Sequence, residues 1–181
     1  MGARAVPAPI AQLPNALTIA RFALVPVFVV LLARADDGSS WAAAIVFAAA
    51  AVTDQVDGWL ARRLHVESQF GKYADPLADR LMIDVAVVML FLDDRLPWPA
   101  LAIVIGRDLL LVLGTRLVVP RGYDFSVSFL GKLATWILYA GITFVIATPA
   151  GTDWPLVVFW TGVVLAVAAG VFYALAVWRR P

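Results

Sequence analysis

The hydrophobic pattern divides the chain into six long apolar segments separated by short polar ones. The apolar segments hold 16 to 25 residues, close to the roughly 20 that a membrane-spanning helix needs. The polar separators are rich in Gly, Pro and charged residues, which is typical of loops. The pattern predicts six membrane-spanning helices, over residues 17–32, 41–58, 76–92, 98–119, 127–148 and 154–178.

Composition agrees with this all-α, integral membrane class. Hydrophobic residues make up 62% of the 181 residues and charged residues only 15%, whereas an average soluble domain is about 45–50% apolar. The length fits a single domain over 1–181. A net charge of +1 gives no basis for nucleic-acid binding, and the absence of cysteine excludes disulfides and thiolate chemistry.

The loop charges predict the orientation of the six spans. With the N-terminus in the cytoplasm, the cytoplasmic segments hold Arg4, Arg62, Arg63, Lys72, Arg121, Arg179 and Arg180. The outer loops hold only Arg34 and Arg95 among five aspartates. Positive residues favour the cytoplasmic side, so we expect both termini to be cytoplasmic. Tryptophans at the expected span ends, suited to the membrane interface, are Trp41, Trp98, Trp154 and Trp178.

Four aspartates stand at the cytoplasmic edges of the second and third spans. Asp54 and Asp57 are three residues apart, Asp75 and Asp79 are four apart, and each pair shares one helix face. Antiparallel neighbouring helices would bring the two pairs to one depth, where the carboxylates repel one another unless cations lie between them. Hard oxygen ligands favour Mg²⁺ or Mn²⁺, and zinc is disfavoured without nearby cysteines.

The residues between the two aspartate pairs suit phosphoryl transfer, a common use of carboxylate-held metal pairs. Gly58 and Ala61 are small enough for close approach of a phosphate or nucleotide, and Arg62 is placed to contact a phosphate. Gly71 would free the backbone before the second pair. Intramembrane acids are functional in most membrane proteins, so the four aspartates form the candidate site.

These residues carry a family resemblance. The pattern Asp54-x2-Asp57-Gly58-x2-Ala61-Arg62-x8-Gly71-x3-Asp75-x3-Asp79 resembles, at all eight positions, the signature of the CDP-alcohol phosphatidyltransferases. The stretches PNALTIARFALVP and FGKYADPLADRLM resemble its bacterial glycerophospholipid branch. The resemblance implies six spans with cytosolic termini, a homodimer, and a bacterial plasma-membrane protein whose active site faces the cytoplasm. The short N-terminus departs from the family, which usually has an amphipathic helix before the first span.

The resemblance also implies roles for the motif residues. The diphosphate of CDP-diacylglycerol would lie over two Mg²⁺ or Mn²⁺ ions, one held by Asp54, Asp57 and Asp75 and the other by Asp54, Asp75 and Asp79. Asp79 would also take the proton of the acceptor hydroxyl as general base, and CMP would leave. The residues implied in nucleotide binding are Asp57, Gly58, Ala61, Arg62 and Gly71.

Charged residues inside other spans have two interpretations. Arg107 and Lys132 occupy positions where the glycerophospholipid branch carries basic residues, and with Arg21 they are candidates for binding the acceptor's phosphate. Alternatively, they form ion pairs with neighbouring helices. Arg80 and Asp84, four residues apart, are expected to pair along one helix. Gly106, Gly114 and the alanine-rich stretch 42–52 are expected to permit close helix packing.

The acceptor is left with three candidates. Glycerol 3-phosphate, which gives phosphatidylglycerol phosphate, is placed first, and phosphatidylglycerol, which gives cardiolipin, second. The stretches GRDLLLV and 121–140 resemble cardiolipin synthases of the actinobacterial type more closely. Inositol phosphate is third.

The sequence disfavours two classes of protein outside this family. An intramembrane prenyltransferase also uses aspartates and Mg²⁺, but its acidic motifs are far apart in sequence. A cation transporter would place its acids near the middle of a span.

Overall fold

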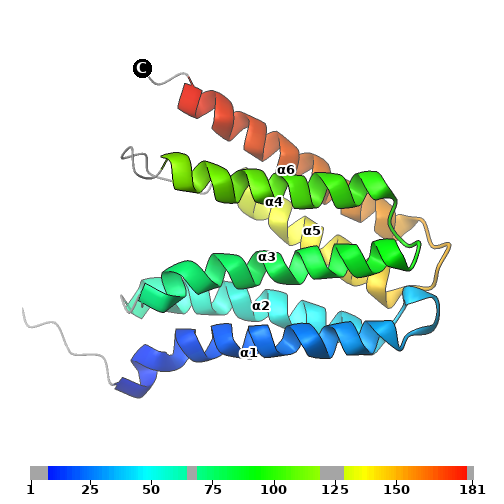
Figure 1. The fold of residues 1–181 in the computed structure, drawn as a ribbon, viewed down its shortest axis with the longest axis horizontal. Helices are drawn as coiled ribbons and strands as arrows, with labels where there is room; N and C mark the ends of the chain where they lie inside the picture. Colours follow the sequence, from blue (N-terminus) through cyan, green and yellow to red (C-terminus); the bar gives the residue numbers. More distant parts are fainter. Residues whose placement is uncertain (1–7, 65–68, 119–128, 179–181) are drawn as a thin grey trace, which may run out of the picture.

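In this computed structural model the described residues form six α-helices packed side by side in a bundle (Figure 1). The backbone is described for residues 8–64, 69–118 and 129–178. Side chains are described for 19–35, 37–53, 80–110 and 129–172, with residues 16 and 175. The helices are α1 (Ala8–Ala33), α2 (Trp41–Leu64), α3 (Gln69–Leu92), α4 (Trp98–Val118), α5 (Phe129–Ala147) and α6 (Trp154–Trp178), with a 3₁₀ turn, η1 (Asp36–Gly38).

The helix boundaries agree with the hydrophobic pattern for α4, α5 and α6 to within two residues. The first three helices are longer than expected, and α1 begins at Ala8, nine residues before the segment predicted from residue 17. The stretch from Ala61 to Asp75 was expected to be a loop, but α2 continues to Leu64 and α3 begins at Gln69. Its Ala, Arg, Leu, Gln and Lys residues are good helix formers, so helix continues beyond the apolar segments that the pattern detects.

The helices alternate in direction along the bundle. Figure 1 shows the links α1–α2, α3–α4 and α5–α6 together at one end. The last turns of α2, the first turns of α3 and the C-terminus lie at the opposite end. We call the former the tryptophan end, because Trp41, Trp98 and Trp154 begin α2, α4 and α6 there. The latter is the aspartate end.

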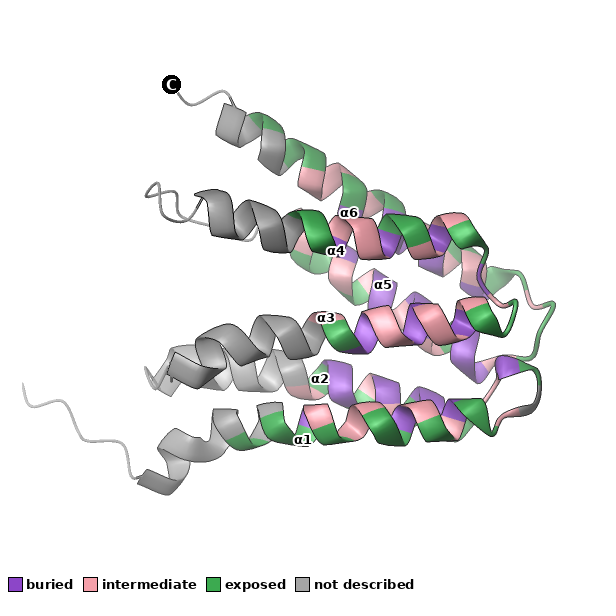
Figure 2. Ribbon diagram, in the orientation of Figure 1, coloured by how far each residue is buried: buried purple, intermediate pink, exposed green. Residues whose placement is uncertain are grey.

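Among the residues whose side chains are described, buried hydrophobic residues face inward from each helix and form a continuous core (Figure 2). Buried positions on α4 recur every four residues at Ala100, Val104 and Asp108, which places them on one helix face. Aromatic rings of Phe28, Phe47 and Tyr139 connect α1, α2 and α5, with ring centroids 5.7 Å apart in each contact. Close packing of these side chains joins the three helices.

Helices α5 and α6 cross in direct backbone contact at two glycines. A Cβ atom on Gly141 would lie 2.5 Å from the Cα of Phe159, and one on Gly162 would lie 2.6 Å from the backbone nitrogen of Leu138. Both distances are shorter than a side chain tolerates, so only glycine permits this crossing. Gly106, which was expected to support close packing, has open space within 4 Å of its added Cβ, so that expectation was wrong within this chain. The surroundings of Gly114 lie outside the described part of the structure.

Arg95 joins three links at the tryptophan end. Its guanidinium donates to the carbonyl oxygens of Asp37 at 2.9 Å, Val145 at 2.7 Å and Thr148 at 2.8 Å. Burial lowers the pKa of Arg95, while nearby Asp93 and Asp37 oppose that effect, and arginine stays charged at neutral pH. This one side chain therefore ties the α1–α2 and α5–α6 links to the α3–α4 turn.

The outside of the bundle is apolar along much of its described length. Large hydrophobic side chains exposed there include Leu110, Val157, Val164 and Phe172. Among the described residues, the segments Phe129–Ala147 and Trp154–Phe172 are long and apolar enough to cross a membrane by length and composition. Trp41 and Trp98 are 72% and 70% exposed, as residues at a membrane interface would be.

Candidate active site

The adjoining ends of α2 and α3 carry the four motif aspartates. Asp54 and Asp57 belong to the last three turns of α2, and Asp75 and Asp79 to the first three turns of α3. Figure 1 shows both helix ends at the aspartate end of the bundle, and α2 and α3 are in contact. The backbone therefore brings both aspartate pairs to one end of the bundle, while their side chains lie outside the described residues.

The other motif positions follow the same helices. Gly58, Ala61 and Arg62 lie within α2, and Gly71 lies in the first turn of α3. The helices continue through both glycines, so Gly58 does not end α2 and Gly71 is not in a loop. The side-chain environment of these four residues lies outside the described part of the chain.

The donor set of this site suits a hard divalent cation. Four carboxylates at two adjoining helix ends, in a chain without cysteine, offer oxygen ligands alone. Mg²⁺ and Mn²⁺ prefer such ligands, whereas sites rich in sulfur select zinc. The residues present therefore fit the metal that the sequence motif implies.

A cluster of four charged residues lies between α3 and α4, and we call it the α3–α4 charge cluster (Arg80, Asp84, Arg107 and Asp108). Asp108 is buried, and its Oδ1 lies 3.8 Å from Nε of Arg107 and 4.0 Å from Nη1 of Arg80. Arg80 also donates to the carbonyl oxygen of Asp108 at 2.7 Å. Asp84 interacts electrostatically with the other three members.

The contacts of this cluster differ from those expected for Arg80 and Arg107. Arg80 was expected to pair with Asp84 along α3, but its ion pair reaches across to Asp108 on α4. Arg107 does form an ion pair, but with Asp108, the next residue of its own helix, and not with a neighbouring helix as the alternative interpretation expected. About 20% of its side chain nevertheless remains exposed, which leaves room for a ligand.

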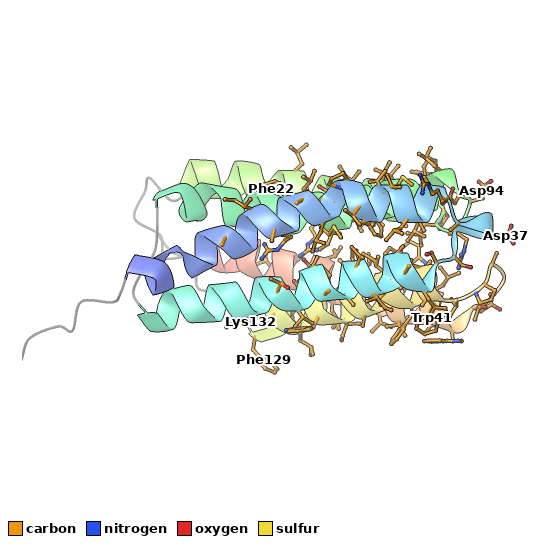
Figure 3. The ribbon with its side chains drawn as sticks, turned by 90° about the horizontal axis from the view of Figure 1, so that it is seen from below. Phe22, Asp37, Trp41, Asp94, Phe129 and Lys132 are labelled. Atoms are coloured by element: carbon orange, nitrogen blue, oxygen red, sulfur yellow. The ribbon has the colours of Figure 1, made fainter. Side chains whose placement is uncertain are left out.

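The other two expected acceptor residues lie on different helices. Arg21, on α1, is almost completely buried at 1% exposure. Lys132, at the start of α5, is exposed. Figure 3 shows Lys132 and Phe22, the neighbour of Arg21, in the same half of the bundle, away from Trp41.

A match to a family model identifies the family of this chain. The model for CDP-alcohol phosphatidyltransferases matches residues 11–171. The chain belongs to this family. It is accordingly an enzyme, and members of the family generally depend on a divalent metal.

Several relatives of this phosphatidyltransferase share sequence over most of its length. One, the CDP-diacylglycerol–glycerol-3-phosphate 3-phosphatidyltransferase of Bacillus subtilis, is 38% identical over 69% of this chain and 71% of its own. A probable phosphatidylglycerophosphate synthase of Mycobacterium tuberculosis is 33% identical over 91% of this chain and 80% of its own. The Escherichia coli CDP-diacylglycerol–glycerol-3-phosphate 3-phosphatidyltransferase is 31% identical over 80% of this chain and 91% of its own.

Sequence reasoning did not assign a role to Asp108, which the structure places at the centre of the charge cluster. The signal that would have found it is its spacing. Asp108 falls four residues after Val104 and eight after Ala100, on the buried stripe of α4. An acid in a core position next to a candidate ligand-binding arginine points to a partner on the facing helix.

Proposed function

We propose that this phosphatidyltransferase transfers the phosphatidyl group of CDP-diacylglycerol to glycerol 3-phosphate, giving phosphatidylglycerol phosphate and CMP in phospholipid biosynthesis. The choice of glycerol 3-phosphate as acceptor rests on two relatives, 31% and 38% identical, that are both named glycerol-3-phosphate phosphatidyltransferases. The eight motif positions carry the donor chemistry.

The four aspartates hold the reacting groups. Asp54, Asp57 and Asp75 would hold one divalent ion, and Asp54, Asp75 and Asp79 a second, as Mg²⁺ or Mn²⁺. When bound, the ions supply positive charge to the diphosphate oxygens and to the leaving group. This arrangement is supported by the adjoining ends of α2 and α3, which carry all four residues.

Proton transfer is assigned to Asp79. It accepts the proton of the acceptor hydroxyl as general base. The freed oxygen forms a bond to the β-phosphorus of CDP-diacylglycerol, and the bond from that phosphorus to the bridging oxygen breaks. CMP leaves with the bonding electrons. Asp57, Gly58, Ala61, Arg62 and Gly71 bind the nucleotide, with the small residues letting it approach the helix backbone.

The acceptor's phosphate is assigned to Arg107, Arg21 and Lys132. Arg107 has the strongest support, because its partly exposed guanidinium carries a buried Nε without a hydrogen-bond partner. An anionic ligand would provide that partner, and arginine binds phosphate with paired N–H donors. Lys132 is exposed and Arg21 buried in the same half of the bundle.

The protein crosses a bacterial plasma membrane six times as one domain, with both termini and the aspartate end in the cytoplasm. The loop charges support this orientation. It forms a homodimer surrounded by membrane lipids, as the family resemblance implies. A single protomer mass in native mass spectrometry from mild detergent, at every concentration tested, would contradict the dimer.

One assay tests the acceptor. Purified protein receives CDP-diacylglycerol with Mg²⁺ and one acceptor at a time, and the lipid product is identified by mass. We expect phosphatidylglycerol phosphate from glycerol 3-phosphate. Cardiolipin formed only with phosphatidylglycerol would favour a cardiolipin synthase. A product formed only with inositol phosphate, or with free serine or inositol, would refute the glycerol assignment.

A further inference from the structure

Asp108 holds two arginines in two different ways. It occupies a core position of α4 in register with Ala100 and Val104, where an apolar side chain is the usual occupant. Arg80 comes from α3 and donates Nη1 to the Asp108 carbonyl oxygen at 2.7 Å, in addition to its ion pair. Arg107 approaches only the carboxylate, at 3.8 Å. That distance is an ion pair and is too long for a hydrogen bond.

The hydrogen-bonding capacity of Arg107 is therefore unused. Its Nε is buried without a hydrogen-bond partner. Within the described part of the chain, the structure gives its guanidinium no hydrogen bond at all. Arg80, by contrast, is fixed to the backbone of the facing helix. The Arg80 guanidinium thus joins α3 to α4 by a hydrogen bond. The Arg107 guanidinium is held only by its ion pair, and its N–H donors are available.

The carboxylate of Asp108 is also what allows the two guanidiniums to lie together. Each lies within 4.0 Å of the same Oδ1 atom. Without that negative charge, the two cations would share only the carboxylate of Asp84, which interacts electrostatically with both, and their mutual repulsion would increase. Arg80 is anchored through its hydrogen bond, so Arg107 would be the one to move.

We propose that Asp108 is a positioning residue of the acceptor site, which fixes the Arg107 guanidinium against α3 while leaving its N–H donors for the acceptor's phosphate. This inference rests on the proposed function, which assigns that phosphate to Arg107. Asp108 itself touches no substrate. Its effect on the reaction is therefore confined to the acceptor and leaves the CDP-lipid site at the α2–α3 ends unchanged.

The test is Asp108→Asn, which removes the charge but keeps the shape and the backbone carbonyl that Arg80 uses. We expect the KM for glycerol 3-phosphate to rise about tenfold, while the KM for CDP-diacylglycerol and kcat stay within about threefold of wild type. A folded variant with an unchanged KM for glycerol 3-phosphate overturns the inference. So does an equal loss for both substrates, which would indicate a purely structural role.

A second variant guards against a failure to fold. Arg80→Gln combined with Asp108→Asn removes one charge of each sign, so no cation is left facing another. We expect its KM for glycerol 3-phosphate to stay raised, because Arg107 has still lost its anchor. A return to the wild-type value would show that Asp108 serves only Arg80 and would overturn the inference. Arg80→Gln alone is the matched control and should keep a KM near that of wild type.

Arg107→Gln separates this inference from the proposed function. If this variant leaves the KM for glycerol 3-phosphate unchanged, the assignment of the acceptor's phosphate to Arg107 fails, and the positioning role fails with it. If Arg107→Gln raises the KM and Asp108→Asn does not, the acceptor assignment stands and the positioning role alone is overturned.

Discussion

At the scale of single residues, Asp79 is the motif acid with two assigned tasks, metal binding and proton transfer. Asp79→Asn keeps the size and one ligand oxygen but cannot take a proton at neutral pH. We expect kcat to fall at least about 100-fold, the usual scale of general base catalysis. CDP-diacylglycerol binding should weaken far less. CMP release and equilibrium binding of the CDP-lipid measure the two effects separately.

Asp94→Asn is the matched control for Asp79. Asp94 is exposed in the α3–α4 turn at the other end of the bundle, and its φ of 55° is one that asparagine adopts readily. Its activity should match wild type. Turnover of Asp79→Asn within a few-fold of wild type would show that another group takes the proton.

Arg95 has a structural role that a second arginine at the same end does not share. Arg95→Lys keeps the charge but loses the planar fork that reaches Asp37, Val145 and Thr148. We expect a loss of about 1–3 kcal/mol in the free energy of unfolding, measured as a lower Tm in one detergent. Arg34→Lys, at an exposed position, should leave the Tm unchanged. Equal Tm values for the two variants would contradict this role.

The candidate site residues could be predicted from sequence where residue type and spacing are enough to identify them. The aspartate motif is such a case, because a spacing of three or four fixes a shared helix face. The partner of Arg80 could not be predicted. It depends on how α3 and α4 are rotated about their axes, and this rotation brings Arg80 into an ion pair with Asp108 on α4. Local spacing does not encode that rotation.

At the scale of elements, the apolar segments gave the number of helices and most of their ends. They missed the turns of α2 and α3 that extend into polar sequence, because hydropathy detects a membrane core and not a helix. The expected small-residue contacts of α2 were partly right, since Ala43, Ala44, Ala50 and Ala51 are buried. The tightest crossing described, between α5 and α6, was not foreseen.

The α5–α6 crossing predicts unequal effects for two glycines of one helix. Gly162→Ala would place a Cβ 2.6 Å from the Leu138 nitrogen and force the helices apart. We expect a loss of at least about 2 kcal/mol. Gly170→Ala meets nothing within 4 Å and should leave stability unchanged or slightly raised. Thermal unfolding in the same detergent compares them. An unchanged Tm for Gly162→Ala would show that the two helices are farther apart than these distances indicate.

The pairing of the α2 and α3 ends predicts a requirement for divalent metal. Four carboxylates at one site repel one another, and the substrate diphosphate adds further negative charge. Excess EDTA should abolish CMP release, and Mg²⁺ or Mn²⁺ added beyond the EDTA should restore it. Ca²⁺, which prefers longer bonds and higher coordination, is the comparison ion. Full turnover in excess EDTA would refute the metal assignment.

At the scale of the whole molecule, the alternating helices separate two functions. The aspartate end carries the candidate chemistry, and the tryptophan end carries the Arg95 contacts that join the links. The loop charges predict that these two ends lie on opposite sides of the membrane. They do not predict that Arg95, an apparent exception to the charge bias, is occupied by backbone carbonyls.

The orientation can be tested directly because the chain has no cysteine. Asp153→Cys introduces one thiol at an exposed position before α6, at the tryptophan end. His65→Cys introduces one at the residue that follows Leu64, the last residue of α2. With the aspartate end in the cytoplasm, a membrane-impermeant maleimide added to intact spheroplasts should label only Asp153→Cys. Both variants should react after the membrane is opened with detergent. Labelling of His65→Cys alone in intact spheroplasts would reverse the orientation and place the active site outside the cell, away from cytoplasmic glycerol 3-phosphate.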